Sequence, residues 1–273
     1  DGETRIAYVQ ADLLLLTREQ FQVAKRRAQE LTGIPCSHQM MSCTHTHYAP
    51  VTVGIFGLDQ ETEYVEWMLP RLADAVKLAC NRLQPAVIGH TSGSCPEEVH
   101  NRRWWLSNGQ VQANPAVGSP ELVRPAAGTD PEVALLVIET PEGKPIAAIA
   151  NYALHYVGGD GRTISADYFG AFAAALQRMA GAEFVAIMAN GCCGDINNVD
   201  RLHPREYTPP YADYRVDRVG HVIAAECYKR WRQLDTRQAP GRRGEELADL
   251  ERVRHPGRVA EADLLAAGRR QLL

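Results

Sequence analysis

The stretch Cys43-Thr44-His45-Thr46-His47-Tyr48-Ala49-Pro50 is the part of the sequence from which both the fold and the chemistry are best inferred. It follows a short apolar run at 39–42, which is typical of a strand that ends in a loop. Alternate residues of an extended backbone point to the same side, so His45 and His47 are expected to project together from one edge of a sheet. Imidazole is a common metal ligand and an acid or base near neutral pH, although two such histidines also fit a surface or packing role.

Helical patterns flank this stretch on both sides. Thr17 and Gln20 form a capping box ahead of apolar residues at helical spacing, and Gly33 is a residue that typically ends a helix. A second helix is expected over 61–83, where Pro70 should kink or divide it. Further helices are expected over 168–180 and 211–234.

Extended patterns alternate with these helices. The sequences Asn108-Gly109 and Pro141-Glu142-Gly143 are typical of the turns of β-hairpins. Strands are expected at 5–12, 85–91, 99–105, 132–139, 144–151 and 183–189. We therefore predict an α/β fold, in which a layered domain has a mixed β-sheet flanked by helices and an active site in the loops at strand ends.

The composition is that of a globular protein of 273 residues, of which 45% are hydrophobic and 23% are charged. A net charge of -4 gives no electrostatic support for nucleic-acid binding. No apolar stretch approaches the roughly 20 residues that a transmembrane helix needs. The 7 cysteines include no C-x-x-C pair, which favours reduced, buried thiols and a reducing compartment.

The chain is expected to divide near its C-terminus. Residues 1–235 have the alternating patterns of one α/β domain. From about Thr236 charged residues dominate and Pro240-Gly241 breaks the pattern, so 236–273 is expected to be a charged, helical linker or a truncated continuation. The chain opens on Asp1 without a Met, and it is expected to be soluble, and cytoplasmic or, if an upstream signal was removed, secreted. The oligomeric state is left open.

Four segments have a common design, in which a strand runs into a loop of small and polar residues. They lie at 44–47, 101–103, 151–155 and 190–198. Together, His45, His47 and His155 match the three protein ligands that a catalytic zinc typically takes, although a carboxylate is an equally good third ligand. Asp195 is expected either to orient a ligand histidine or to be a structural turn residue. Asp167 precedes a helical pattern, which favours a role as N-cap.

These segments resemble, in their order and spacing, the motifs of the neutral/alkaline non-lysosomal ceramidase family, in its N-terminal catalytic domain. The resemblance covers most of the predicted domain. The matching motifs are Thr44-His45-Thr46-His47-Tyr48-Ala49-Pro50, Asn101-Arg102, Asn151-Tyr152-Ala153-Leu154-His155, Ser165-Ala166-Asp167-Tyr168-Phe169-Gly170 and Asn190-Gly191-Cys192-Cys193-Gly194-Asp195-Ile196-Asn197.

The resemblance implies that residues 1–235 are a zinc-dependent hydrolase domain that cleaves the N-acyl bond of ceramide, or of a similar lipid amide, in sphingolipid metabolism. It implies that His45 and His155 are zinc ligands and that His47 is the nearby acid or base. It also implies that Arg102 helps to hold the reacting oxygen, and that Asn197 lines the site. Zinc would polarise the amide carbonyl or generate hydroxide, and an imidazole would pass the proton to the leaving amine.

The chain also departs from the family pattern. Tyr48-Ala49 stands where the family has Ser-Gly, and Asn197-Asn198 stands where it has Ser-Pro. The family takes a further Glu and a Tyr as zinc ligands from a region beyond residue 235. Two alternatives therefore stay open, a metal-binding domain without activity and a hydrolase of non-lipid amides or esters. A third alternative is a hydrolase that uses Cys192 or Cys193 as its nucleophile, with a histidine as base.

Overall fold

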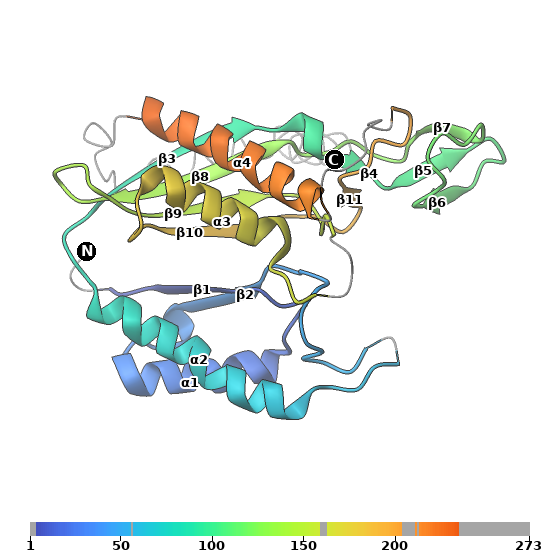
Figure 1. The fold of residues 1–273 in the computed structure, drawn as a ribbon. Helices are drawn as coiled ribbons and strands as arrows, with labels where there is room; N and C mark the ends of the chain where they lie inside the picture. The colour runs from blue at the N-terminus through green and yellow to red at the C-terminus, as the bar shows by residue number, and fades with distance from the viewer. Residues whose placement is uncertain (1–3, 56, 159–162, 204–210, 212, 235–273) are drawn as a thin grey trace, which may run out of the picture. The chain divides into compact units, whose positions relative to one another are not determined.

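The computed structural model describes residues 4–55, 57–158, 163–203, 211 and 213–234 (Figure 1). The segment 236–273, expected to be a linker or a continuation, lies outside the described residues. Helices and several sheets make up the described part of the chain, which confirms the predicted α/β class. Among the described helices, none combines the length and the apolar character that crossing a membrane requires.

The N-terminal part is built on a parallel pair of strands. β1 (Ala7–Ala11) and β2 (Gln39–Cys43) lie side by side in parallel, and α1 (Arg18–Thr32) connects them. α2 (Thr62–Asn81) follows and packs on α1 and β1. The apolar residues between these elements form a separate buried cluster, which includes Ala24, Ala28, Leu72 and Val76. This first βαβ unit therefore has a core of its own.

The ends of α1 form as the sequence predicts. The backbone N–H of Gln20 donates to the Thr17 side chain, and the backbone N–H of Thr17 donates to the Gln20 side chain, which completes the capping box. Gly33 ends the helix at φ 73°, a left-handed conformation that costs glycine little. α2 was expected to be kinked or divided at Pro70, and the structure has one uninterrupted helix through this residue.

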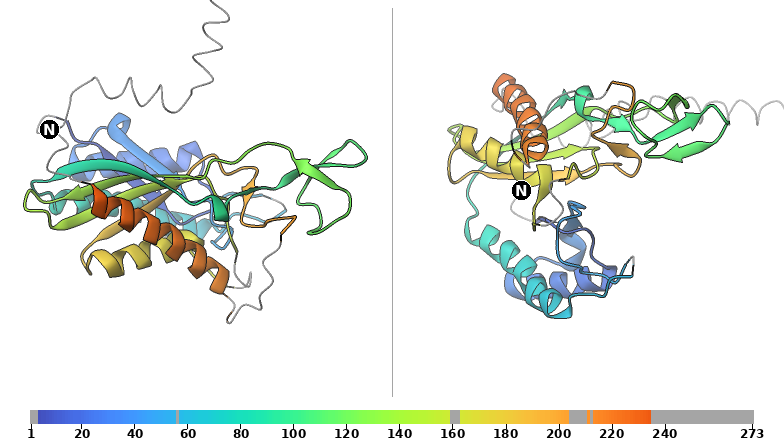
Figure 2. Two further views of the ribbon diagram at one scale, coloured as in Figure 1. Left: turned by 90° about the horizontal axis from the view of Figure 1, so that it is seen from above. Right: turned by 45° about the vertical axis from the view of Figure 1, so that its right-hand side comes forward.

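The larger sheet is mixed, as predicted. Its strand order is β10-β9-β8-β3, in which β9 and β10 are parallel and the other neighbours are antiparallel. The strands span Val87–Ser94 (β3), Glu132–Glu139 (β8), Pro145–Tyr152 (β9) and Val185–Asn190 (β10). α3 (Asp167–Ala180) connects β9 to β10, and it packs beside α4 (Tyr214–Gln233) on one face of the sheet (Figure 1, Figure 2).

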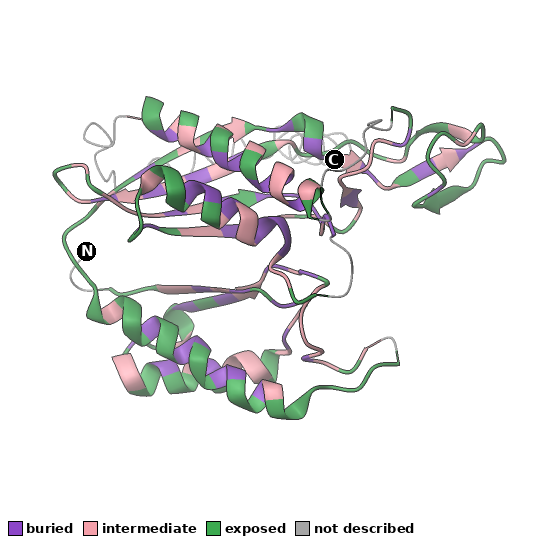
Figure 3. Ribbon diagram, in the orientation of Figure 1, coloured by how far each residue is buried: buried purple, intermediate pink, exposed green. Residues whose placement is uncertain are grey.

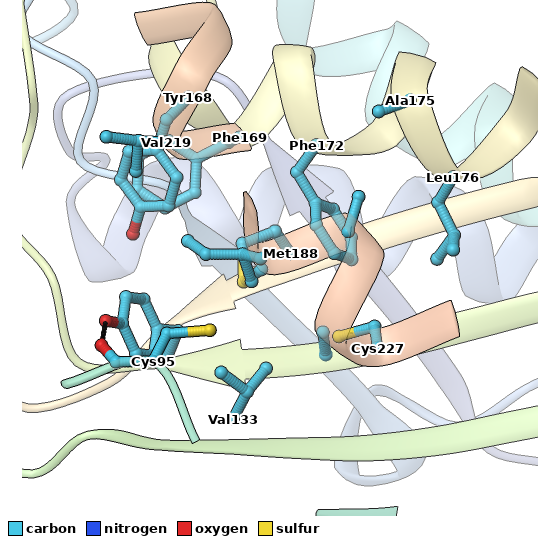
Figure 4. Close-up of a cluster of buried hydrophobic side chains, with 14 of the residues drawn as sticks. Cys95, Val133, Tyr168, Phe169, Phe172, Ala175, Leu176, Met188, Val219 and Cys227 are labelled. Atoms are coloured by element: carbon cyan, nitrogen blue, oxygen red, sulfur yellow. Dashed lines mark hydrogen bonds between the residues drawn. The ribbon is translucent and has the colours of Figure 1, made fainter. Parts of the chain in front are cut away.

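The face of the sheet under α3 and α4 is the main hydrophobic core. Alternate residues of β8 (Val133, Leu135 and Val137) are buried, as expected for a strand with one covered face (Figure 3). Figure 4 shows Phe172 and Leu176 of α3 among the side chains that fill the space above the strands. Burial contributes roughly 25 cal/mol per Å² of apolar surface, so this core holds β9 and β10 firmly in place.

The strand expected at 99–105 is wrong as a single element. It is divided into β4 (His100–Asn101) and β5 (Arg103–Leu106). β4 pairs with β11 (Ile196–Asn197), whereas β5 pairs with β6 (Val111–Ala113) and β7 (Leu122–Pro125). The change of partner occurs at Arg102, whose N–H donates to the Asp195 carbonyl and whose own carbonyl accepts from Asn114. Two short 3-10 turns, Cys36–His38 and Pro96–Glu98, complete the described elements.

The N-cap role predicted for Asp167 is also wrong. α3 begins at Asp167 itself, and its N-cap residue, Ala166, makes no capping hydrogen bond through its side chain. Asp167 has φ 57°, outside the conformation of an N-cap, and its carboxylate accepts hydrogen bonds from the backbone of Val157 and Gly158. The acidic group therefore holds a distant loop as well as accepting from the first-turn N–H of Tyr168 at 2.6 Å.

Candidate metal centre

Loops from both parallel strand pairs meet at the carboxyl ends of their strands. β2 leads into His45 and His47, and β9 leads into His155. Each of the three rings offers one nitrogen, and these nitrogens all lie within 4.8 Å of one another. The ring centroids are 4.8 to 5.2 Å apart. The structure therefore brings together the three histidines that the sequence singled out, and the group could hold a metal ion.

Two of the three rings are oriented by backbone carbonyls. Nδ1 of His45 is 3.0 Å from the carbonyl oxygen of Leu14, and Nδ1 of His155 is 3.2 Å from that of Cys193. A carbonyl only accepts, so in both rings Nδ1 carries a hydrogen, and in the neutral form of each ring Nε2 is the nitrogen with the lone pair. Metal-binding histidines are usually fixed in this way by a hydrogen bond at their second nitrogen.

The third ring, His47, lies against His155. Their Nε2 atoms are 3.2 Å apart, which fits a hydrogen bond donated by His47 to the lone pair of His155. Two nitrogens that share a tetrahedral zinc are about 3.3 Å apart, because Zn–N bonds are about 2.0 Å long. The spacing thus suits either arrangement, with little movement of the rings between them. The donor set, imidazole nitrogens at chelating distance, fits a zinc ion.

Two of these rings are neutral at physiological pH. Burial, followed by the charges of His155, His45 and Arg102, lowers the pKa of His47 from its usual 6.5 to about 4. Burial, followed by His45 and Arg102, also lowers the pKa of His155 to about 4, and its hydrogen bond to Cys193 offsets only part of this effect. Only neutral imidazole has a lone pair for a metal, so the rings are ready to bind one.

The backbone at His45 is strained. Its φ is 69°, a left-handed conformation that residues other than glycine seldom adopt. Hydrogen bonds hold it there, because the N–H of His45 donates to the Leu13 carbonyl at 3.0 Å and the N–H of Thr44 donates to the Ala11 carbonyl at 2.9 Å. Asn190 adds a third tie, donating from its side chain to the Thr44 carbonyl at 2.9 Å. Strain of about 1–3 kcal/mol is typical of functional sites whose surroundings enforce a geometry.

The positive charge of Arg102 acts on two of the three rings. It lowers the pKa of both His47 and His155, so its guanidinium lies within electrostatic reach of them. Its Nε is buried and has no hydrogen-bond partner among the residues that the structure describes. A buried donor without a partner costs free energy, which an anionic oxygen at this position would recover.

The other two loop residues proposed from the sequence have partners elsewhere. The Asn197 side chain donates to Asn114 at 3.0 Å and accepts from the backbone of Val199 at 3.2 Å. The Asp195 carboxylate accepts from the Asn101 side chain at 3.3 Å. The carbonyls of Leu14 and Cys193 perform the orienting task considered for Asp195, and a role of Asn197 in lining the site stays a prediction.

Two features of the site were missed in the sequence. Tyr156 stacks on His47 with ring centroids 3.9 Å apart, and Tyr48 meets Tyr156 edge-on at 6.3 Å. An aromatic wall therefore stands beside the most exposed of the three histidines. The position of Tyr156 next to His155 was a usable signal, whereas the carbonyls that orient the rings have no signature in the sequence.

The cysteine alternative finds little support at Cys193, and a role of Cys192 stays a prediction. Burial raises the pKa of the Cys193 thiol, and a hydrogen bond from Asn190 and the charge of Arg102 only oppose this effect. A nucleophilic cysteine needs the opposite shift, because the thiolate is the reactive form. The contribution of Cys193 to the site comes from its backbone carbonyl.

Comparison with solved structures gives this arrangement a context. The chain is similar to a neutral ceramidase from Pseudomonas aeruginosa, with a TM-score of 0.66 and 19% sequence identity over 83% of this chain. It is equally similar to a structure of ceramidase complexed with C2, with a TM-score of 0.66 and 20% identity over 83% of this chain. The chain spans 36% of the length of each of these proteins. No protein-family model matches the sequence, and no curated protein matches it. The fold is therefore ceramidase-like.

Proposed function

We propose that this chain is a zinc-dependent amide hydrolase that resembles neutral ceramidase and cleaves the N-acyl bond of a lipid amide. The observation that carries the proposal is the convergence of His45, His47 and His155, with their nitrogens within 4.8 Å, at the strand ends of a ceramidase-like fold. The oriented Nε2 atoms and the lowered pKa values of two rings support a metal centre over a packing role.

The three histidines have different environments, which argues for different roles. His45 and His155 have Nδ1 fixed by carbonyls, and in our proposal they hold the zinc. His47 is exposed, and its Nδ1 makes no hydrogen bond among the described residues, so its ring is available to move a proton at Nε2. A bound zinc would supply a Lewis acid that polarises a carbonyl and acidifies water.

Arg102 is proposed to bind the oxygen on which negative charge develops. Its buried, unpartnered Nε and its electrostatic reach to His47 and His155 support this role. Donors that are already in place and shielded from water stabilise such charge strongly, because they need no reorganisation during the reaction. Asn197 is proposed to line the same site from β11, which follows β10.

The proposal is tested by zinc content and hydrolysis in the same preparations. We expect about one zinc per chain, hydrolysis of N-acyl lipid amides that chelation abolishes and zinc restores, and loss of both in His45→Ala. His90→Ala is the matched control, because His90 is exposed on β3 and paired with Leu136, away from the three rings. His47→Ala should keep its zinc and lose turnover.

Other outcomes separate the alternatives. Activity that survives complete removal of the metal would refute the zinc mechanism. Zinc binding without turnover on any amide or ester would replace the hydrolase by a metal-binding domain. Turnover restricted to soluble amides or esters would retain the mechanism and reject the lipid substrate. Loss of zinc in His47→Ala would make His47 a third ligand.

A further inference from the structure

The start of α3 contacts both of the loops that carry the histidines. The hydroxyl of Thr46 donates to the Ser165 carbonyl at 2.8 Å, and the N–H of Ser165 donates to the Tyr48 carbonyl at 2.9 Å. Both bonds secure the loop of His45 and His47. The residues that follow, Asp167 and Tyr168, secure the loop of His155. One short segment, 165–168, thus ties together two loops that are more than a hundred residues apart in the sequence.

Asp167 is the centre of this tie. Its side chain is buried, with 2% of the residue exposed, and its carboxylate accepts from the N–H groups of Val157 at 3.1 Å and Gly158 at 3.0 Å. It also accepts from the N–H of Tyr168 at 2.6 Å. A buried carboxylate needs such donors, and three backbone N–H groups supply them, with no ion pair to Asp167 among the residues that the structure describes. The chain accepts φ 57° at Asp167 to make these bonds.

Neighbouring groups complete the hold on the backbone around His155. The hydroxyl of Tyr168 donates to the Leu154 carbonyl at 2.9 Å, immediately before His155. Arg215 of α4 donates to the Val157 carbonyl at 2.7 Å. Leu154, Val157 and Gly158 are therefore all bonded to the start of α3 or to α4. The ring of His155 has little freedom to leave its position beside His47.

We infer that Asp167 is a positioning residue of the metal centre, which sets the spacing between His155 and the pair His45 and His47. This inference rests on the proposed function, because the hydrogen bonds of Asp167 can position metal ligands only if the three rings bind a metal. A positioning residue acts through the geometry of the ligands, and removal of such partners typically costs about 10–100-fold in metal affinity. If these bonds were only structural, their removal would lower the stability of the chain and leave the metal affinity of the folded chain unchanged.

The test is cobalt binding to the metal-free chain and to Asp167→Asn, followed by titration and by the visible absorption of the bound cobalt. Asparagine tolerates the left-handed φ of this position, but its amide has only one acceptor oxygen. With that oxygen accepting from Val157 and Tyr168, the NH2 group takes the place of the carboxylate oxygen that accepts from the N–H of Gly158. We expect about a 10–100-fold weaker affinity in Asp167→Asn and a changed absorption spectrum, which reports the arrangement of the ligands.

The control is Glu139→Gln. Glu139 is a buried carboxylate that accepts from Trp231 at 2.8 Å, and it lies at the end of β8 that pairs with the start of β9, remote from His155. This variant should bind cobalt as the wild type does. If Asp167→Asn does not fold, Tyr168→Phe tests the same tie, because it removes only the hydroxyl that holds Leu154, and it should weaken cobalt binding several-fold.

Each outcome decides the question. Weaker binding with a changed spectrum in Asp167→Asn, and not in Glu139→Gln, supports the inference. Unchanged affinity and spectrum in a folded Asp167→Asn, while the wild type binds cobalt, overturns the inference alone. A wild type that binds no cobalt overturns the proposed metal centre, and the inference with it.

Discussion

The chain contains two parallel βαβ units, β1–α1–β2 and β9–α3–β10, and both contribute to the candidate metal centre. In each unit, the loop after one strand supplies a histidine and the loop after the other strand supplies the carbonyl that orients it. His45 is oriented by Leu14 in the first unit, and His155 is oriented by Cys193 in the second. The common element is the carboxyl edge of a parallel strand pair, where such loops converge.

The difference between the units lies at the start of their helices. α1 is capped by the residues at its own start, Thr17 and Gln20, and the Gln20 side chain also donates to the Thr52 carbonyl at 2.8 Å. α3 has no side-chain cap at Ala166, and its first residue, Asp167, binds the backbone around Gly158 instead. At the first helix start the capping bonds join neighbours in sequence. At the second, one carboxylate accepts both from the first-turn N–H of Tyr168 and from the loop of His155. The comparison teaches that a helix start without a cap is a place to look for a tertiary role.

The largest effect on stability is expected at Gly158, which is bonded to Asp167, and it is compared with Gly33, which ends α1. In Gly158→Ala, the new Cβ would lie 2.7 Å from the Tyr48 hydroxyl, and the residue would be strained at φ 87°. We expect a loss of about 2–4 kcal/mol in the free energy of unfolding. In Gly33→Ala the nearest atom, on Arg5, is 3.8 Å away and φ is 73°, so only the strain of about 1 kcal/mol remains.

Urea denaturation of the two glycine variants measures this difference. Tyr48→Phe combined with Gly158→Ala should recover part of the loss, because it removes the atom that the new Cβ meets first. Equal losses in the free energy of unfolding of Gly158→Ala and Gly33→Ala would show that the contact with Tyr48 has no effect on stability. The expected difference between the two units would then be wrong.

An intermediate effect is expected from pH in the metal-free chain. The pKa of His47 and of His155 is about 4 in the folded state, against the usual 6.5 in the unfolded state. Between these values the unfolded chain binds protons at both rings and the folded chain does not. Stability should therefore be fully present above about pH 6.5 and fall as the pH is lowered toward about 4.

Denaturation midpoints between pH 7 and pH 4 test this dependence, with His47→Gln as the comparison that cancels the titration of the carboxylates. The variant should lose less stability over the same range than the wild type. Parallel curves for the two proteins would mean that the His47 ring titrates normally in the folded state.

The smallest effect is expected at the cap of α1. Thr17→Ala removes the acceptor of the Gln20 N–H and should cost about 1 kcal/mol of stability. It should leave zinc uptake unchanged, because the capping box has no bond to the histidine loops through Thr17. Thermal denaturation and the metal content of the same sample check both statements. Reduced zinc uptake would contradict the claim that the start of α3 supports the metal centre and the Thr17 cap of α1 does not.

Local signals made much of this architecture predictable. The capping box at Thr17, the glycine stop at Gly33 and the hairpin between β8 and β9 depend on neighbours in sequence, and the structure confirms them. The mixed sheet followed from helices and hairpins in alternation. The three histidines were recognisable because each follows a strand, so the sequence was sufficient to predict that their rings come together.

The parts that were not predictable depend on long-range contacts. The strand at 99–105 changes partner at Arg102 because Asp195 and Asn114, distant in sequence, take its backbone hydrogen bonds. The bonds that the Asp167 carboxylate accepts from Val157 and Gly158 likewise depend on a loop outside the helix that contains Asp167. Backbone carbonyls orient the rings, and a carbonyl is present at every residue, so no pattern distinguishes it.

The most direct test of the central claim is X-ray absorption at the zinc edge of the zinc-loaded chain, which counts the imidazoles around the metal. The account predicts at least two imidazole nitrogens at about 2.0 Å, from His45 and His155, and a reduced imidazole count in His155→Ala. A zinc spectrum without imidazole scattering, or one that His155→Ala leaves unchanged, would contradict the claim that these rings form the metal centre.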